Sequence, residues 1–236
     1  MMNKIRPNWN VSSSVKVLVT TKDFNFRKNF NIAYGCEKSS IVRGNINILK
    51  DKLLPSRPFF VKQVHGKKVI NIDKDNYSYV ADGIITQEKN KVIGVRTADC
   101  IPIIISSLCG SIICILHVGR KGLEFNIIQK ACSLLENFKF SYEAWIGPCI
   151  SKEYYLVDSD IKNTFEEIDK RSLGFFKKNG NFFSMDLAGL ASLQLNDCNI
   201  SNIFYSDLCT VKNKDLFFSH RGFADRKRFG TFVWIE

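Results

Sequence analysis

Histidine is rare in this sequence of 236 residues, which contains only His65, His117 and His220. A metal site built on imidazole must therefore draw its ligands from these three side chains. The eight cysteines form no C-x-x-C pair, so the local spacing of zinc-ribbon and thioredoxin-like motifs is missing. A centre that combines His and Cys has to be assembled here from segments far apart in the chain.

The sequence also lacks the marks of a secreted protein. Residues Met1–Asn10 contain no apolar core of the kind that a signal peptide has. Several cysteines lie within apolar runs such as Ile112–Leu116. We therefore expect a cytoplasmic protein with reduced thiols rather than a disulfide framework.

An uninterrupted membrane-spanning run is missing as well. Residues Cys100–Gly119 contain no Asp, Glu, Lys or Arg and reach the length of a spanning helix. Pro102, Gly110 and three serines interrupt this stretch. Two Ile-rich runs separated by small polar residues are typical of a buried β-hairpin, so we expect no membrane partner.

The composition is that of a globular protein with an excess of positive charge. A content of 45% hydrophobic and 24% charged residues excludes disordered and fibrous classes. Lys and Arg number 34 against 23 Asp and Glu, which gives a net charge of +11 and favours anionic ligands. The basic residues are scattered, and their densest group, Arg226–Arg228, is short. A solvated face is therefore favoured over a nucleic-acid patch.

The apolar pattern predicts a mixed α+β protein. Strands are expected at Val15–Thr20, Phe59–Val64, Val69–Ile72, Ile84–Thr86, Val92–Val95, Ile101–Ile105, Ile112–Leu116, Phe217–Ser219 and Thr231–Ile235. Helices are expected at Ile41–Leu53, Leu123–Phe138, Asp158–Ile168 and Asp186–Leu195, the last two capped by their first Asp. Strands and helices do not alternate regularly, which favours mixed layers over a doubly wound sheet. No repeat or linker is visible, so a single domain over residues 1–236 is expected.

The predicted hairpin brings a cysteine and a histidine together. A turn centred between Leu108 and Cys109 would place Cys100 directly opposite His117. Directly opposed residues share a face, with Cβ atoms about 4.5–5.5 Å apart. His65 also ends an apolar run and is followed by Gly66. Two His and one Cys match a zinc site that keeps a fourth position open, although Cys and His can equally be a nucleophile with its base or two core residues.

Several short motifs occur in an order that resembles the YfiH or laccase-domain family. They are Phe30–Ile32, Gln63–Gly66, Ala81–Gly83, Thr97–Pro102, His117–Gly122, Gly147–Ile150 with Tyr154 or Tyr155 after it, Asp207–Thr210 and Phe218–Arg221. The resemblance extends from about residue 18 to the C-terminus. It implies a single-domain, layered α/β/β/α fold with a mixed-sheet core.

The resemblance also implies an activity. The expected reaction is zinc-dependent phosphorolysis of adenosine, inosine or guanosine to the base and ribose 1-phosphate, so the partners would be a purine nucleoside and phosphate. Adenosine deaminase and S-methyl-5'-thioadenosine phosphorylase activities are expected to accompany it. Zinc would be held by His65, Cys100 and His117. Copper also suits this ligand set, but three His cannot supply both a blue site and a copper cluster, which argues against the older description of the family as a multicopper polyphenol oxidase (laccase).

Further roles are expected around the metal. Catalytic residues would be Cys100, His65, His117 and Asp99, and substrate-binding residues Gln63, Asp82, Lys121 and Arg221. Asp99 and Asp82 are candidates for moving protons, and Arg120, Lys121 and Arg221 for neutralising phosphate. His220 is expected to be structural rather than a fourth ligand.

The sequence departs from the usual family pattern at one place. The family typically reads His-Ala-Gly-Trp-Arg-Gly after the metal His, whereas this chain has Arg120 in place of Trp and Lys121 in place of Arg. An indole that could stack on a purine is lost, and Lys does not replace Arg for bidentate phosphate binding. We expect this change to affect substrate range more than the metal site.

Two other classes of function stay open at this point. A metal-free hydrolase would use Cys100 as nucleophile and His117 as base. A nucleic-acid-binding protein is suggested by the net charge alone and would show steep salt dependence. Alkylation of Cys100 with and without chelator separates a nucleophile from a metal ligand.

Overall fold

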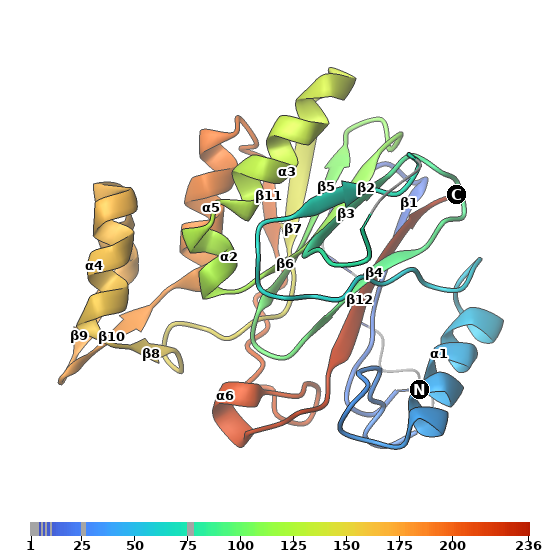
Figure 1. Ribbon diagram of the computed structural model, residues 1–236, viewed down its shortest axis with the longest axis horizontal. Coiled ribbons are helices and arrows are strands. Elements are labelled where there is room, and N and C mark those ends of the chain that lie inside the picture. The colour runs from blue at the N-terminus through green and yellow to red at the C-terminus, as the bar shows by residue number, and fades with distance from the viewer. Residues whose placement is uncertain (1–4, 6, 8, 10, 25–26, 75–77) are drawn as a thin grey trace.

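A computed structural model describes residues 5, 7, 9, 11–24, 27–74 and 78–236. Its strands and helices form four layers, in the order helices, larger sheet, smaller sheet, helix (Figure 1). Three apolar clusters fill the spaces between these layers. The mixed α+β class and the α/β/β/α layering expected from the sequence are confirmed.

The larger sheet has six strands in the order β11-β7-β5-β6-β3-β2. These strands are β2 (Val69–Asn71), β3 (Gly83–Thr86), β5 (Ile101–Ser107), β6 (Ile113–Val118), β7 (Tyr142–Ile146) and β11 (Ile203–Tyr205). The pairs β11–β7 and β2–β3 are parallel, and the others are antiparallel. Every residue of β5 and β6 is buried, because another layer covers each face of this sheet.

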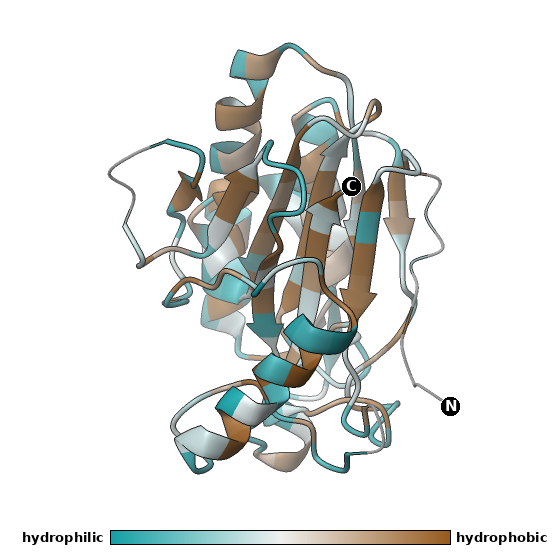
Figure 2. Ribbon diagram, turned by 90° about the vertical axis from the view of Figure 1, so that its right-hand side faces the viewer, coloured by the Kyte–Doolittle hydropathy of each residue, from teal (hydrophilic) through white to brown (hydrophobic). Residues whose placement is uncertain are grey.

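The smaller sheet packs against one face of the larger one. It consists of β1 (Val15–Val19), β12 (Phe229–Ile235) and β4 (Ile93–Thr97), all antiparallel. Side chains such as Ile104 and Ile115 from the larger sheet meet Ile93 and Val233 between the layers. The strands of both sheets are apolar along most of their length (Figure 2). Helix α1 (Ser39–Lys52) covers the outer face of the smaller sheet through Val42, Ile46 and Leu49.

Helices cover the opposite face of the larger sheet. They are α2 (Arg120–Glu124), α3 (Ile127–Leu135), the short 3-10 helix η1 (Glu136–Phe138) and α5 (Leu187–Asp197). A side unit beside them combines α4 (Ser159–Ile168) and the 3-10 helix η2 (Lys170–Phe175) with β8 (Leu156–Val157), β9 (Phe176–Asn179) and β10 (Phe182–Met185) (Figure 1). The one-turn helix α6 (His220–Phe223) precedes β12. Within the described residues no helix is both long and apolar enough to cross a membrane.

The predicted hairpin exists as β5 and β6, but its register differs from the prediction. Pro102, not Cys100, is the partner of His117. The turn is centred one position later because Gly110 takes a left-handed φ of 71°, a conformation that glycine adopts at little cost. A shift of one position in the turn moves the pairing by two residues, which leaves Cys100 on the same face as His117, at a diagonal position.

Two predicted strands are wrong. Phe59–Val64 makes only isolated bridges, at Phe59 with Ile93 and at Lys62 with Val80. Its backbone therefore pairs with two different segments and builds no continuous ladder. Phe217–Ser219 is fully buried but irregular, and Ser219 instead caps α6 by accepting a hydrogen bond from the Gly222 N–H.

The helix predicted at Leu123–Phe138 is interrupted. Asn126 takes a left-handed conformation with φ 58° and separates α2 from α3. The helices predicted at Asp158 and Asp186 exist as α4 and α5, each beginning one residue later. Asp186 caps its helix by accepting from the Gly189 N–H at 2.9 Å. Asp158 makes no such bond, so the cap predicted there is wrong.

Candidate metal centre

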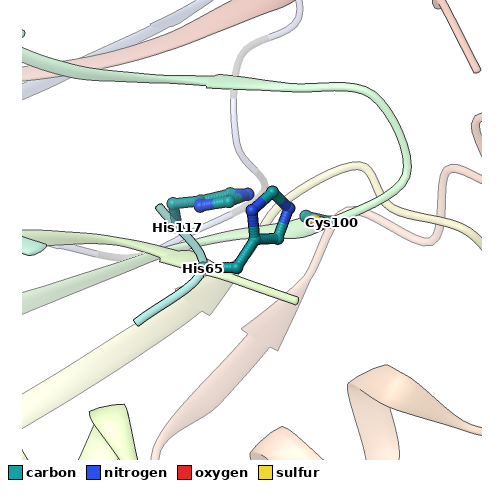
Figure 3. A group of neighbouring side chains, drawn as sticks. All are labelled: His65, Cys100 and His117. Atoms are coloured by element: carbon teal, nitrogen blue, oxygen red, sulfur yellow. The ribbon is translucent and has the colours of Figure 1, made fainter. Parts of the chain in front are cut away.

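Three side chains from three segments converge between the two sheets. His65 follows the irregular segment 59–64, Cys100 lies between β4 and β5, and His117 is on β6. Their ligand atoms all lie within 4.8 Å of one another. The two imidazole rings meet edge to face with centroids 4.7 Å apart, and Figure 3 shows them grouped with the Cys100 thiol. The fold thus assembles the group that no local spacing in the sequence could define.

The loop that carries His65 is held by one buried carboxylate. Asp82, fully buried, accepts hydrogen bonds from the backbone N–H groups of Val64, His65 and Gly66 at 2.8–3.2 Å. Consecutive N–H groups that point at one anion form a nest. His65 takes a left-handed φ of 59° in this loop. Asp82 therefore fixes the backbone from which the His65 ring projects.

The same carboxylate orients the second imidazole. Asp82 Oδ1 lies 2.8 Å from His117 Nδ1. Burial opposes the charged form of Asp82, but the hydrogen bonds from His117 and the backbone outweigh burial and lower its pKa. With Nδ1 engaged, Nε2 is the nitrogen of His117 available to a metal. A carboxylate behind a ligating His is a common feature of metal sites, where it fixes the ring and raises its basicity.

The thiol of Cys100 has a strongly shifted pKa. Burial alone would raise it, but His117 and His65 favour the thiolate and lower the pKa to about 6. Burial would likewise lower the pKa of His117, whereas the Cys100 and Asp82 charges raise it to about 9. Both shifts favour a thiolate at neutral pH, the form of cysteine that binds metals and attacks electrophiles.

The backbone at Gly119 lies close to two of the three side chains. A Cβ atom at Gly119 would lie 2.8 Å from Cys100 Sγ and 3.2 Å from His65 Cδ2. Position 119 must therefore be glycine for the three side chains to keep their places. One thiolate and two imidazoles are the donor types of three-ligand zinc sites, and they suit copper as well. The residues present fit a metal ion of this class.

Asp99 joins three segments beside Cys100. Its carboxylate accepts from the Thr210 hydroxyl and the Arg221 N–H, each at 2.6 Å. Its carbonyl oxygen accepts from the Ile150 N–H at 3.0 Å. Asp99 has a φ of 90°, which is unfavourable for a non-glycine residue and persists only where surrounding contacts enforce it. These contacts make Asp99 a positioning residue for the Cys100 backbone.

Gln63 also connects two segments of the chain by hydrogen bonds. Its Nε2 donates to the Arg96 carbonyl at 2.8 Å, and its Oε1 accepts from the Arg96 N–H at 2.9 Å. Both ends of the amide therefore hydrogen-bond to the backbone of β4. Gln63 ties the loop of His65 to the smaller sheet.

A cavity of about 520 Å³ opens onto the group. It is lined by Ala33, Tyr34, Lys62, Gln63, His65, Arg96, Thr97, Ala98, Asp99, Cys100, His117, Tyr155, His220, Arg221 and Arg228. The structure thus brings the expected Gln63, Asp99 and Arg221 into one cavity with the three ligands. Asp82 lies behind His117 rather than in the cavity lining.

Two residues expected to bind phosphate lie elsewhere. Arg120 forms an ion pair with Glu124 one turn along α2, and Lys121 is exposed on the same helix. Neither contributes to the cavity lining. His220 does line the cavity but is not part of the group of three ligands.

Sequence reasoning missed other lining residues, above all Arg96, Arg228 and Lys62. Lys62 and Arg96 directly precede the motifs Gln63–Gly66 and Thr97–Pro102, which was the signal that could have found them. Arg228 belongs to the basic group Arg226–Arg228, for which a solvated face was favoured, but it lines the cavity. Tyr155 was paired with Tyr154 as an alternative in the family motif. The structure places Tyr155 in the cavity lining, while Tyr154 is 44% exposed.

The chain is similar in sequence to proteins named purine nucleoside phosphorylase. The chain is 28% identical to a purine nucleoside phosphorylase of Haemophilus influenzae over the full length of both chains. It is 31% identical to a purine nucleoside phosphorylase of Xylella fastidiosa, covering 77% of this chain and 74% of that protein. It is 29% identical to the purine nucleoside phosphorylase YfiH of Escherichia coli, covering 77% and 75%.

Solved structures show the same fold. A Neisseria meningitidis protein of the DUF152 family superposes with a TM-score of 0.89 at 24% identity, over 99% of each chain. A hypothetical protein YfiH of Bacillus licheniformis gives a TM-score of 0.84 at 22% identity, over 94% and 93%. The family described as multi-copper polyphenol oxidoreductase laccase matches residues 18–236. The chain therefore belongs to this family, the YfiH or laccase-domain family.

Proposed function

We propose that this chain is a zinc-dependent purine nucleoside phosphorylase. The observation that carries the proposal is the group of His65, Cys100 and His117, with ligand atoms within 4.8 Å, at a cavity lined by cationic side chains. Relatives named purine nucleoside phosphorylase over most or all of the chain support it. The cavity volume, about 520 Å³, is within the range of small-molecule sites.

The proposed reaction transfers a ribosyl group. A phosphate oxygen forms a bond to C1' of the ribose, the bond from C1' to the purine nitrogen breaks, and the base leaves with the electron pair. The bound zinc ion would supply a Lewis acid that polarises substrate oxygens. The cationic side chains of the cavity bind and orient the phosphate, which converts its attack into a step within one complex.

The carboxylates near the site act by positioning other groups. Asp82 holds His117 and the His65 loop, and Asp99 holds Thr210 and the Arg221 backbone. Both carboxylates are therefore engaged by protein donors. This favours phosphorolysis over deamination as the main reaction, because deamination needs a carboxylate that is free to move protons. Adenosine deaminase and S-methyl-5'-thioadenosine phosphorylase activities are proposed as accompanying reactions.

The test combines metal analysis with product identification. We expect one zinc per chain, and adenine with ribose 1-phosphate after adenosine and phosphate are mixed with the protein. Cys100→Ala should lose both the zinc and the products. Cys109→Ala is the matched control, because this exposed thiol lies in the β5–β6 turn and outside the cavity lining. Identical products from wild type and Cys100→Ala would contradict the proposal.

A metal-free hydrolase is the second candidate, and one observation favours it. The lowered pKa of Cys100 and the raised pKa of His117 are typical of a cysteine nucleophile paired with its base. Alkylation separates the two: rapid labelling of Cys100 in metal-loaded protein indicates a nucleophile. Protection that a chelator removes indicates a metal ligand.

Colour separates zinc from copper, the other metal that suits this set of side chains. A copper ion held by one Cys and two His would absorb visible light, whereas zinc would leave the protein colourless. The chain has only three histidines, too few for a multicopper oxidase.

The eight cysteines are free thiols, which supports the cytoplasm as the proposed compartment.

A further inference from the structure

The cavity beside the candidate metal centre carries an excess of positive charge. Lys62, Arg96, Arg221 and Arg228 line it, and Asp99 is the one carboxylate among the described lining residues. Both oxygens of Asp99 already accept hydrogen bonds, from Thr210 and from the backbone of Arg221. Among the described residues none of these cationic side chains forms an ion pair with a carboxylate, so the cavity favours an anionic ligand.

Arg96 is the best-defined of these cations. Its Nη2 donates to the Val61 carbonyl at 2.9 Å, and its guanidinium stacks 4.8 Å from the centre of the Phe60 ring. Gln63 fixes its backbone from the other side. Arg96 is half-buried, and burial lowers its pKa. Among the described residues it forms no ion pair with a carboxylate.

Two further guanidinium groups are held in the same manner. Arg221 donates to the Leu156 carbonyl at 2.9 Å and stacks 4.8 Å from the Tyr155 ring centre. Arg228 donates to two backbone carbonyls at 2.8 and 3.0 Å. Neutral carbonyls orient these groups and leave their charge uncompensated. A guanidinium has five N–H donors, so each keeps donors for a ligand.

Two other arginines of the chain are neutralised by carboxylates. Arg171 forms ion pairs with Asp169 and Asp197, and Arg120 pairs with Glu124. Among the described residues no carboxylate forms such an ion pair with Arg96, Arg221 or Arg228. Preformed guanidinium groups without a carboxylate match the geometry of phosphate oxygens, which they bind in pairs.

We propose that Arg96, Arg221 and Arg228 form a phosphate subsite in this cavity, in place of Arg120 and Lys121. The ligand class is a phosphate dianion, either free or as a monoester. The assignment of free phosphate as co-substrate rests on the proposed phosphorylase function. The subsite itself depends only on the cavity and its charges.

Binding of inorganic phosphate alone tests the subsite directly. Titration calorimetry should show that Arg96→Gln weakens phosphate binding about 10- to 100-fold, the loss expected for one charged hydrogen-bonding partner. Arg96→Lys should recover part of the affinity, since it keeps the charge but not the paired donors. Arg57→Gln is the matched control, because Arg57 is exposed and outside the cavity lining.

A second variant guards against a folding defect. Arg221 is exposed, so Arg221→Gln should keep the melting temperature of the wild type while it weakens phosphate binding. The same titrations on a Cys100→Ala background separate the arginines from any phosphate held by a metal. Unchanged phosphate affinity in both Arg96→Gln and Arg221→Gln would overturn the subsite.

Kinetics distinguish failure of the subsite from failure of the function. In a working phosphorylase, Arg96→Gln should raise the KM for phosphate and leave the KM for the nucleoside unchanged. Phosphate binding that is lost in Arg96→Gln, in a protein without phosphorolysis, supports the subsite and contradicts the function. Phosphorolysis with an unchanged KM for phosphate in Arg96→Gln supports the function and contradicts the subsite.

Adenosine 5'-monophosphate is the comparison ligand that separates free phosphate from a phosphate monoester. If it binds more tightly than inorganic phosphate, and if this binding is lost in the same variants, the subsite is assigned to a phosphate monoester.

Discussion

A single buried residue, Asp82, explains how two of the three candidate metal ligands, His65 and His117, are held. It accepts from three backbone N–H groups of the His65 loop and pairs with His117 Nδ1. The family motif Ala81–Gly83 led us to expect Asp82 as a substrate-binding residue and as a candidate for moving protons. A motif indicates that a residue lies near the site, but it does not show which way its side chain points. The Asp82 carboxylate points away from the cavity and hydrogen-bonds to the His65 loop and to His117.

Replacing this carboxylate should weaken zinc binding. In Asp82→Asn the side chain keeps its shape but loses its charge, so His117 loses the partner that orients it and raises its basicity. Loss of such a partner typically reduces metal affinity about 10- to 100-fold. Competition with a chelating dye measures the affinity. Asp169→Asn, which changes an acid outside the cavity, should have no effect, and equal affinities for the two variants would contradict the role of Asp82.

Glycine at position 119 should be essential for the arrangement of His65, Cys100 and His117. The added methyl of Gly119→Ala would lie 2.8 Å from Cys100 Sγ, closer than real Cβ contacts, so the thiol or the strand end must move. We expect less than one zinc per chain and at least a tenfold loss of activity, measured by elemental analysis and rate. Gly174→Ala is the matched control, because a Cβ there meets nothing within 4 Å. Full zinc content in Gly119→Ala would show that the site adjusts.

At the scale of elements, the hairpin shows what a sequence pattern can and cannot fix. The two Ile-rich runs predicted β5 and β6, but the turn position was misjudged by one residue and the register by two. Side chains alternate between faces with a period of two, so an even shift preserved the face of Cys100. The proximity of Cys100 and His117 was therefore predictable, while their direct opposition was not.

Other elements could not be predicted because contacts between distant segments determine them. Phe59–Val64 has strand-like residues, yet its backbone pairs with two segments in turn. Asn126 interrupts a continuous apolar helix pattern by taking a left-handed conformation. Propensity describes single residues, whereas both outcomes depend on what the neighbouring segments offer as hydrogen-bond partners.

The two aspartates at helix starts give a matched test of capping. Asp186→Ala removes the bond to the Gly189 N–H of α5 and should lower the free energy of unfolding by about 1 kcal/mol. Asp158→Ala at α4 removes no cap bond and should cost clearly less. Chemical denaturation of both variants measures the difference. An equal loss in both would mean that the carboxyl charge, rather than the cap bond, matters.

At the scale of the whole molecule, the site depends on the stacking of layers. Its ligands come from a loop, from the connection between β4 of the smaller sheet and β5 of the larger, and from β6. The cavity arginines come from residues 96, 221 and 228, again from distant parts of the chain. The net charge of +11 indicated an anionic ligand, but only the fold shows where the uncompensated cations gather.

A metal that joins these segments should stabilise the whole fold. A ligand that binds only the folded state adds about 2.7 kcal/mol when its free concentration is 100 times its Kd, equivalent to about 5–10 °C in a domain of this size. Removing zinc with a chelator should therefore lower the Tm by about this amount, measured by calorimetry before and after zinc is restored. Cys100→Ala should show no difference between the two conditions, whereas Cys109→Ala should behave as wild type. An unchanged Tm in wild-type protein that has lost one equivalent of zinc would mean that the three segments are held in place without the metal, by Asp82, Asp99 and Gln63 alone.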